Sequence, residues 1–440
     1  MDILIGLVIL GVIILVHEWG HFIIARLFGV RVDVFSIGFG PRLFGFKRGA
    51  TDWRISALPL GGYVRMAGQD ITDIDSGDQK PTGAPDELMS KTRWQRALIS
   101  FAGPAVNLIF PILLLGTYFL ISGEPYPAYF DQPVTIVGVS AQSTSGLQVG
   151  DKVTSINGVK NPTWRDANKV LEQAAVGSML KVQVTAPDGV TRDANIPYKT
   201  GSDDHTFGFA PIAPKVLQVL PGKPASVAGM KDGDLIRSVD GKPVEYWDQF
   251  VAAVHNSQGQ PMHLEITRKG KPVSLTVTPV IGAAQSGDKV YQIGIGPDVP
   301  LASKSLGFVG AFKAGFIQTA NFVIETVGVV YKLVTGGVSV RDLQSVVGIS
   351  RAAGEAVNFG PSATILFMAL ISVNLGVLNL LPIPILDGGH ITLLALEGLR
   401  RRDFSIAFKE RLIQVGLVFL LVLIVYVTYN DVARIFTRHS

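Results

Sequence analysis

The chain has 440 residues, of which 48% are hydrophobic and only 17% are charged. Soluble domains usually carry about 25% charged residues, so this composition favours a membrane protein with a soluble part. A net charge of +4 without basic clusters interleaved with aromatic residues argues against a nucleic-acid partner. The absence of cysteine excludes disulfides, thiolate nucleophiles and cysteine-ligated zinc, so any zinc must be bound by His, Asp or Glu.

The first apolar segment, residues 3–24, contains the sequence HEWGH. It is long enough to cross a bilayer, which needs about 20 apolar residues, and we expect it to be retained because it lacks the basic start of a signal peptide. HEWGH fits the pattern H-E-x-x-H, in which His17 and His21 lie one helical turn apart and can bind one zinc ion from the same face. Glu18 is adjacent and can accept a proton from a water at the metal.

Residues 25–96 follow this span and contain eleven Lys or Arg residues. Two stretches, 32–40 and 53–64, alternate polar and apolar residues, which predicts strands. Residues 67–90 are acidic and show no core-forming pattern, so we expect a loop there. The second span, residues 97–122, contains no Asp, Glu, Lys, Arg or His.

An internal repeat follows the second span. SGLQVGDKVTSING at 145–158 and AGMKDGDLIRSVDG at 228–241 share three glycines, an Asp and a Ser at a constant offset of 83 residues. This period predicts a duplicated small domain, and both copies resemble the short signature of a PDZ domain. PDZ domains bind an extended peptide as an added strand, and the alternative is two β-rich domains that bind nothing.

Residues 310–333 are apolar but contain Lys313, Glu325 and Lys332. Glu325 and Lys332 fall with two amide side chains on one narrow face of a helical wheel, which is typical of a helix at the membrane interface. We therefore expect an interfacial helix here and not a fifth span.

The third span, residues 358–386, leads into the sequence NLLPIPILDGGH. Pro382 and Pro384 are expected to break the helix and free backbone groups, which are tolerated only beside a cavity or a protein partner. A catalytic zinc needs a third protein ligand, and both Asp387 and His390 are available. Because these two residues are three positions apart, geometry alone does not choose between them.

The fourth span covers residues 412–430. The positive-inside rule places the basic segments 25–96 and 400–402 in the cytoplasm, which leaves residues 123–357 and both termini outside. His17 lies about 14 residues into its helix, roughly 21 Å at 1.5 Å per residue, and Asp387 also falls toward the cytoplasmic side. The two motifs can therefore meet.

HExxH in the first span and N-x-x-P-x-P-x-L-D-G in the third resemble the site-2 protease family of intramembrane zinc metalloproteases. Two PDZ-like repeats between the second and third spans make the chain similar to the bacterial RseP (regulator of sigma-E protease) branch. FGP at 39–41 and AGPAVN at 102–107 extend the resemblance over nearly the whole chain.

The resemblance implies roles for individual residues. It implies that His17, His21 and Asp387 bind one zinc ion and that Glu18 is the general base. It favours Asp387 over His390, which would then support the site without binding the metal.

The resemblance also concerns the substrate. It implies that Asn379 and Pro382 bind an unwound substrate peptide. It further implies that the predicted hairpin dips into the membrane beside the active site, where an edge strand pairs with the substrate. The alternative is an ordinary cytoplasmic hairpin.

The expected fold class is a polytopic α-helical membrane protein with four transmembrane helices, two periplasmic PDZ-like α/β domains and a membrane-associated β-hairpin element. The expected segments are a first transmembrane helix (1–25), a β element with the acidic loop (26–96), a second transmembrane helix (97–122), two PDZ-like domains (126–213 and 214–298), interfacial amphipathic helices (305–357), a third transmembrane helix (358–398) and a fourth (411–430).

We therefore predict an intramembrane zinc metalloprotease of the bacterial inner membrane that acts in regulated intramembrane proteolysis. Expected substrates are single-span proteins such as trimmed anti-sigma factors and remnant signal peptides, with the PDZ-like domains acting as a gate. One alternative is a non-catalytic PDZ scaffold in which HEWGH is polar packing, and another is a metal carrier.

Overall fold

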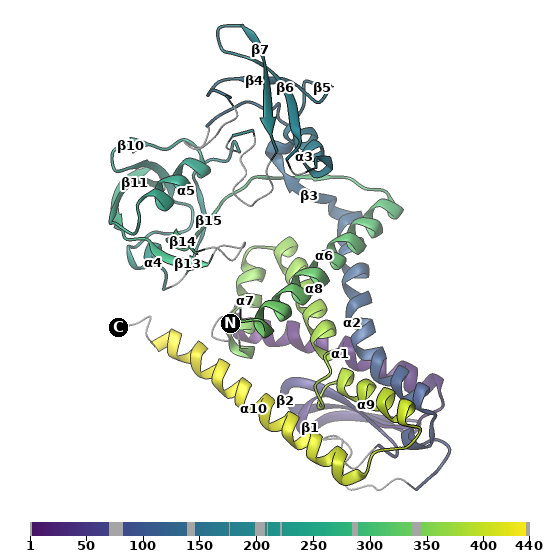
Figure 1. Ribbon diagram of the computed structural model, residues 1–440. Helices are drawn as coiled ribbons and strands as arrows, with labels where there is room; N and C mark the ends of the chain where they lie inside the picture. The colour runs from purple at the N-terminus through teal and green to yellow at the C-terminus, as the bar shows by residue number, and fades with distance from the viewer. Residues whose placement is uncertain are drawn as a thin grey trace. The chain divides into compact units, whose positions relative to one another are not determined.

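The computed structural model describes residues 2–69, 82–138, 146–175, 177–198, 207–208, 210–220, 222–283, 289–336 and 345–436. The chain divides into two compact units, one from Met1–Glu124 with Ser305–Ser440 and one from Pro125–Lys304 (Figure 1). The first unit contains the long apolar helices, and the second consists mainly of short strands. The change of composition along the sequence therefore separates two structural units.

In the described part of the chain, four helices of the first unit are long and apolar enough to cross a membrane, and they coincide with the four predicted spans. They are α1 (Asp2–Leu27), α2 (Arg93–Ser122), α8 (Pro361–Asn379) and α10 (Ile406–Phe436). The helix break predicted at Pro382 and Pro384 is present, because α8 ends at Asn379 and α9 (Asp387–Arg400) follows after a turn. Pro382 and Pro384 lie in that turn and lack the N–H groups that would continue α8.

Two further helices, α6 (Phe308–Val334) and α7 (Val346–Asn358), complete the first unit. α6 packs against α2 at two small residues, since a Cβ atom added to Gly315 would lie only 2.7 Å from the backbone nitrogen of Gly116. Farther along α6, Thr326 Oγ1 lies 2.6 Å from Asn374 Oδ1 of α8 and donates a hydrogen bond to it. α6 thus contacts two of the predicted spans, and its interfacial position stays a prediction.

The two predicted strands are present as β1 (Val32–Arg48) and β2 (Thr51–Met66), which pair antiparallel. Val34 lies opposite both Arg65 and Asp52, so residues 34–37 run between two segments of β2. Residues 39–48 are exposed, whereas the start of β1 packs in a cluster with α1 and α2. The sheet is therefore anchored to the helices that carry the metal motif, and its association with lipid stays a prediction.

The second unit contains two sheets with the same strand order. The first is β5-β4-β6-β7 and the second is β10-β9-β11-β12, each with one helix of ten residues following its second strand. The bounds are β4 (Lys152–Ile156), β5 (Val159–Lys160), α3 (Trp164–Gln173), β6 (Met179–Thr185), β7 (Thr191–Pro197), β9 (Leu235–Val239), β10 (Lys242–Pro243), α5 (Trp247–Asn256), β11 (Met262–Arg268) and β12 (Lys271–Val277). The sequence repeat therefore corresponds to a repeated fold.

The repeated Asp illustrates why the two copies share this signature. Asp151 and Asp234 are fully buried and pair with Arg192 of β7 and Arg268 of β11. A buried carboxylate needs such a partner.

The remaining short elements are η1 (Leu88–Ser90), β3 (Glu124–Pro127), η2 (Ala128–Asp131), β8 (Val216–Val219), α4 (Pro224–Val227), β13 (Val280–Ala283), β14 (Lys289–Gln292), β15 (Ile295–Pro297) and β16 (Leu301–Lys304).

Candidate active site

Close packing of α1 on α2 positions the two histidines of HEWGH. His17 and His21 are 6% and 9% exposed, so both rings are enclosed by protein. A Cβ atom added to Gly103 of α2 would lie 2.8 Å from His17 Cε1 and 2.7 Å from His21 Cε1, which is closer than ordinary van der Waals contact. Glycine at this position therefore leaves the space that the two rings occupy.

Asp387 approaches the histidines from the first turn of α9. Its Oδ2 atom is 3.2 Å from His17 Nε2, its Oδ1 atom is 3.5 Å from His21 Nε2, and the two Nε2 atoms are 3.2 Å apart. Each residue offers one ligand atom, and these atoms lie within 4.8 Å of one another. Ligands at about 2.0–2.1 Å from a tetrahedral zinc ion are roughly 3.3 Å apart, so the distances between these donors are of the size that a zinc site requires.

The ring of His21 is oriented as a metal ligand requires. His21 Nδ1 lies 2.8 Å from the backbone carbonyl of Ile99 in α2 and donates its N–H to it. This hydrogen bond selects the tautomer in which Nε2 carries the lone pair, and Nε2 is the atom that faces Asp387.

The glycines that follow Asp387 let α9 begin at the metal site. A Cβ atom added to Gly388 would overlap the backbone of Leu380, and one added to Gly389 would overlap the carbonyl of Ile383. The turn before α9 and the start of α9 can therefore pack this closely only with glycine at both positions.

Asp387 and His390, between which the sequence does not choose, have different positions. Asp387 forms a candidate metal-binding group with the two histidines. His390 lines the same cavity but does not belong to that group, as far as the described residues show. The distances support Asp387 as the third ligand, and its assignment stays a prediction.

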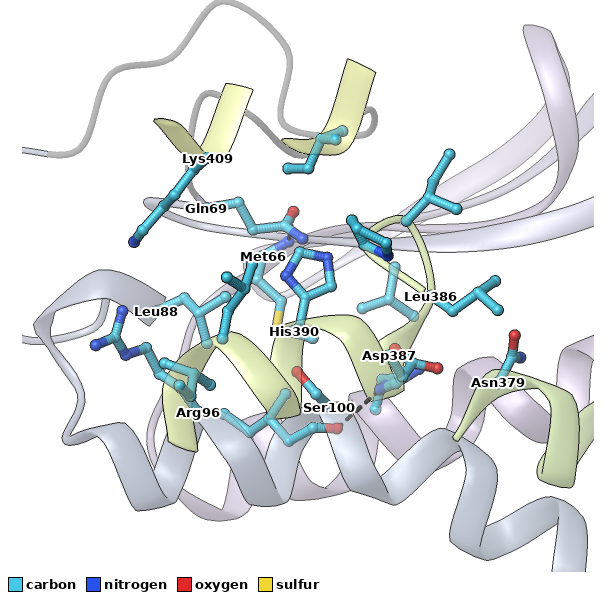
Figure 2. A pocket seen from close by; sticks show the side chains of 18 of the residues that line it. Met66, Gln69, Leu88, Arg96, Ser100, Asn379, Leu386, Asp387, His390 and Lys409 are labelled. Atoms are coloured by element: carbon cyan, nitrogen blue, oxygen red, sulfur yellow. Dashed lines mark hydrogen bonds and ion pairs between the residues drawn. The ribbon is translucent and has the colours of Figure 1, made fainter. Parts of the chain in front are cut away.

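The candidate metal-binding group, formed by His17, His21 and Asp387, lies in a cavity of about 430 Å³, shown in Figure 2. Glu18 and Asn379 line this cavity together with the group, and Asn379 Nδ2 is 3.5 Å from His17 Nε2. Pro384 is also a lining residue, whereas Pro382 is not among those that line the cavity in the described part of the chain. The site therefore collects the metal donors, an acidic side chain and an amide, and it leaves the predicted substrate contact of Pro382 unsupported.

β2 forms another side of the cavity. Val64 and Met66 line it, and a Cβ atom added to Gly62 would lie 3.5 Å from Cγ of Glu18. The strand therefore runs directly beside the acidic side chain of the HExxH motif.

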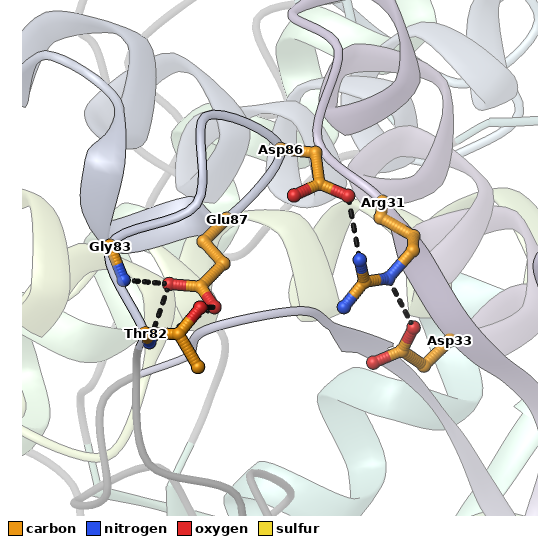
Figure 3. A network of polar contacts seen from close by, with 6 residues as sticks. All are labelled: Arg31, Asp33, Thr82, Gly83, Asp86 and Glu87. Atoms are coloured by element: carbon orange, nitrogen blue, oxygen red, sulfur yellow. Dashed lines mark hydrogen bonds and ion pairs between the residues drawn. The ribbon is translucent and has the colours of Figure 1, made fainter.

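Residues 82–90, predicted as part of an acidic loop, also contribute to the site. Leu88 and Met89 line the cavity. Glu87 is buried and accepts hydrogen bonds from the Thr82 hydroxyl at 2.6 Å and from the N–H groups of Thr82 and Gly83 (Figure 3). These bonds lower the pKa of the Glu87 carboxyl. Residues 70–81 of the predicted loop lie outside the described residues.

A second polar contact in Figure 3 holds the same loop against β1. Arg31 donates to Asp33 at 3.0 Å and to Asp86 at 2.7 Å. Arg31 precedes β1 directly, so this pair of bonds joins the loop to the start of the sheet.

The chain matches a known protein family and several named relatives. The model of the family described as "Peptidase family M50" matches residues 5–423. The chain belongs to peptidase family M50. This M50 chain is 33% identical over 448 residues to the regulator of sigma-E protease RseP of Salmonella typhimurium, and 33% identical over 451 residues to that of Escherichia coli. In both cases the match covers 98% of each chain.

A solved structure is similar to part of the M50 protein. The PDZ domain of the SdrC-like protein from Listeria monocytogenes matches 19% of this chain and 85% of its own length, at 21% identity and a TM-score of 0.17.

Membership of family M50 identifies the chain as a zinc metalloprotease. The alternatives of a non-catalytic scaffold and of a metal carrier are therefore set aside.

The sequence alone assigned no role to Asn107, whose side chain contacts His17. The motif AGPAVN, which contains Asn107, was the signal that could have drawn attention to it.

Proposed function

We propose that this M50 protease cleaves a peptide bond within the transmembrane segment of single-span membrane proteins. The observation that carries the proposal is the convergence of His17, His21 and Asp387, with ligand atoms within 4.8 Å of one another, in a cavity that Glu18 also lines. α1, which carries three of these residues, is one of the four helices long and apolar enough to cross a membrane.

The chemistry follows from the positions of the side chains. Nε2 of His17, Nε2 of His21 and the carboxylate of Asp387 would hold the zinc ion, which would supply Lewis-acid activation of the scissile carbonyl and of the attacking water. Glu18 points about 100° around the helix from His17, so it reaches the cavity without joining the ligand set. Its carboxylate accepts the proton of the water and returns it to the leaving amine.

A substrate must present an extended backbone to this site, because the amides of a helix are bonded internally. Val64 and Met66 of β2 line the cavity. β2 pairs only with β1 among the described strands, so its other edge can replace the lost hydrogen bonds of an unwound segment. Asn379 lies beside His17 and can donate its amide N–H to a substrate carbonyl.

The setting of this reaction is the bacterial inner membrane, with the two-domain unit in the periplasm and the metal site toward the cytoplasm. The basic segments 25–96 and 400–402 support this orientation. The relatives are named regulators of sigma-E protease, which supports trimmed anti-sigma factors as substrates in an envelope stress response, with remnant signal peptides as further candidates. The two PDZ-like domains act as a gate that excludes substrates with a large periplasmic part.

Purified full-length protein in liposomes, with a fluorescent single-span substrate, tests the proposal. Wild type should bind about one zinc ion per chain and cleave within the membrane segment. Glu18→Gln should keep the zinc and lose cleavage, whereas His17→Ala should lose both. Wild-type cleavage by Glu18→Gln would contradict the assignment of the base, and full zinc content in His17→Ala would contradict the ligand set.

A further inference from the structure

Asn107 of α2 is fully buried and lies against the outer side of the His17 ring. Its Nδ2 atom is 3.1 Å from His17 Nδ1, the ring nitrogen that faces away from Asp387. Its Oδ1 atom is also buried and has no hydrogen-bond partner among the described residues. A buried amide oxygen without a partner is an unfavourable arrangement.

The protonation of His17 decides which amide atom belongs beside it. A neutral histidine that offers the Nε2 lone pair to a metal carries its proton on Nδ1. Nδ1–H is then a donor, and the amide of Asn107 as placed presents a second donor to it. Turning the amide by 180° exchanges Oδ1 and Nδ2, which have nearly the same shape, and gives Nδ1–H an oxygen acceptor.

We propose that Asn107 is a positioning residue for the zinc site. Its Oδ1 accepts the Nδ1–H of His17 and holds the ring in the tautomer whose Nε2 binds zinc. This inference rests on the proposed role of His17 as a ligand. It gives His17 the same support that His21 receives from the carbonyl of Ile99, so α2 orients both histidines of α1.

A competing acceptor for His17 is the backbone carbonyl of Gly103, which also faces the ring. That carbonyl lies four residues before Asn107 in α2 and accepts the helical hydrogen bond of the Asn107 N–H, so one lone pair is left for His17. The side-chain oxygen of Asn107 has no partner among the described residues and offers both of its lone pairs.

The backbone around Asn107 is held by a separate contact. Pro111 lies four residues after Asn107 and has no N–H, so the carbonyl of Asn107 lacks its helical donor. Ser372 of α8 replaces that donor, with its Oγ 2.8 Å from the carbonyl oxygen. Ser372 is also fully buried, but its hydroxyl contacts the backbone of Asn107 and not the side chain. A substitution of Ser372 is therefore a matched control for substitutions of the Asn107 side chain.

The test compares zinc affinity, measured by chelator competition on the full-length protein in detergent, with thermal unfolding of the metal-free protein. Asn107→Leu keeps the size but removes the acceptor, and it should weaken zinc binding by about 10–100-fold. Asn107→Asp keeps an oxygen at this position and can only accept, so it should bind zinc nearly as well as wild type. Ser372→Ala should leave zinc affinity unchanged, and metal-free Asn107→Leu should unfold close to the wild-type temperature.

Three results would overturn the proposal. Wild-type zinc affinity in Asn107→Leu would mean that the Gly103 carbonyl suffices. An equal loss in Asn107→Asp and Asn107→Leu would mean that the amide donates and does not accept. An equal loss in Ser372→Ala would mean that helix packing is the cause. A His17→Ala variant measured in parallel separates these results from failure of the proposed function, because zinc retained by that variant would remove His17 from the ligand set.

Discussion

Gly103→Ala should destroy the zinc site by a displacement that can be read from the structure. The added Cβ would lie 2.7 Å from His21 Cε1 and 2.8 Å from His17 Cε1, whereas ordinary contact begins at 3.4 Å. The His21 ring would have to retreat by at least about 0.7 Å, which is the difference between 3.4 and 2.7 Å, because its Nε2 atom lies closer still to the added Cβ. Metal–ligand distances tolerate only about ±0.2 Å, so the displacement is more than three times what the site can absorb.

The neighbouring backbone offers no easy relief. A Cβ atom at Gly20 would overlap the carbonyl of Ala102, which shows that α1 and α2 are already in close contact at this level. We therefore expect Gly103→Ala to lose more than about 100-fold in zinc affinity, since changes that only loosen a ligand's support already cost about 10–100-fold.

Zinc content after dialysis against a chelator, and cleavage of a single-span substrate in liposomes, measure this effect. Gly11→Ala is the matched control, because it makes the same change in α1 where a Cβ atom would meet no described atom within 4 Å. This control should retain zinc and activity. Stoichiometric zinc and full cleavage in Gly103→Ala would refute the reasoning and show that the histidines do not occupy the positions described.

Three further predictions concern the ligands, the loop and the outer domains. Asp387→Asn should release zinc and lose activity, whereas His390→Ala should retain most of the zinc, as metal analysis of the purified variants will show; the reverse order would transfer the ligand role to His390. Because hydrogen bonds lower the pKa of Glu87, its carboxylate should stabilise the loop above its ordinary pKa, and this stabilisation should disappear as pH falls through the lowered value. Glu87→Gln should therefore make residues 82–90 more sensitive to limited proteolysis at pH 7, with unchanged sensitivity arguing against the anchor. Deletion of residues 126–298 should allow cleavage of an untrimmed substrate that the intact enzyme refuses, and continued refusal by the deletion variant would exclude a gating role.

Local features of this protein were predictable from the sequence because their physics is local. Two histidines four residues apart lie on the same face of a helix wherever that helix packs. The pairing of His17 with His21 could therefore be predicted without tertiary information. The four apolar helices follow from length and hydropathy in the same way. The repeated glycines and Asp of residues 145–158 and 228–241 correspond to two sheets of the same strand order, since each copy folds from its own sequence.

Contacts between distant segments were decided only by the tertiary structure. Asp387 and His390 are equally plausible ligands by spacing, and the turn and glycines that start α9 bring Asp387 to His17 across 370 residues of chain, the difference between 387 and 17. The position of residues 82–90 could not be predicted from the sequence, because Glu87 is held by three hydrogen bonds, and such bonds leave no apolar periodicity in the sequence. Asn107 was an isolated amide in an apolar span until packing of α2 on α1 placed it against His17. A hydrogen bond between side chains far apart in sequence leaves no periodic trace in either segment, and only the packing of the helices shows that it forms.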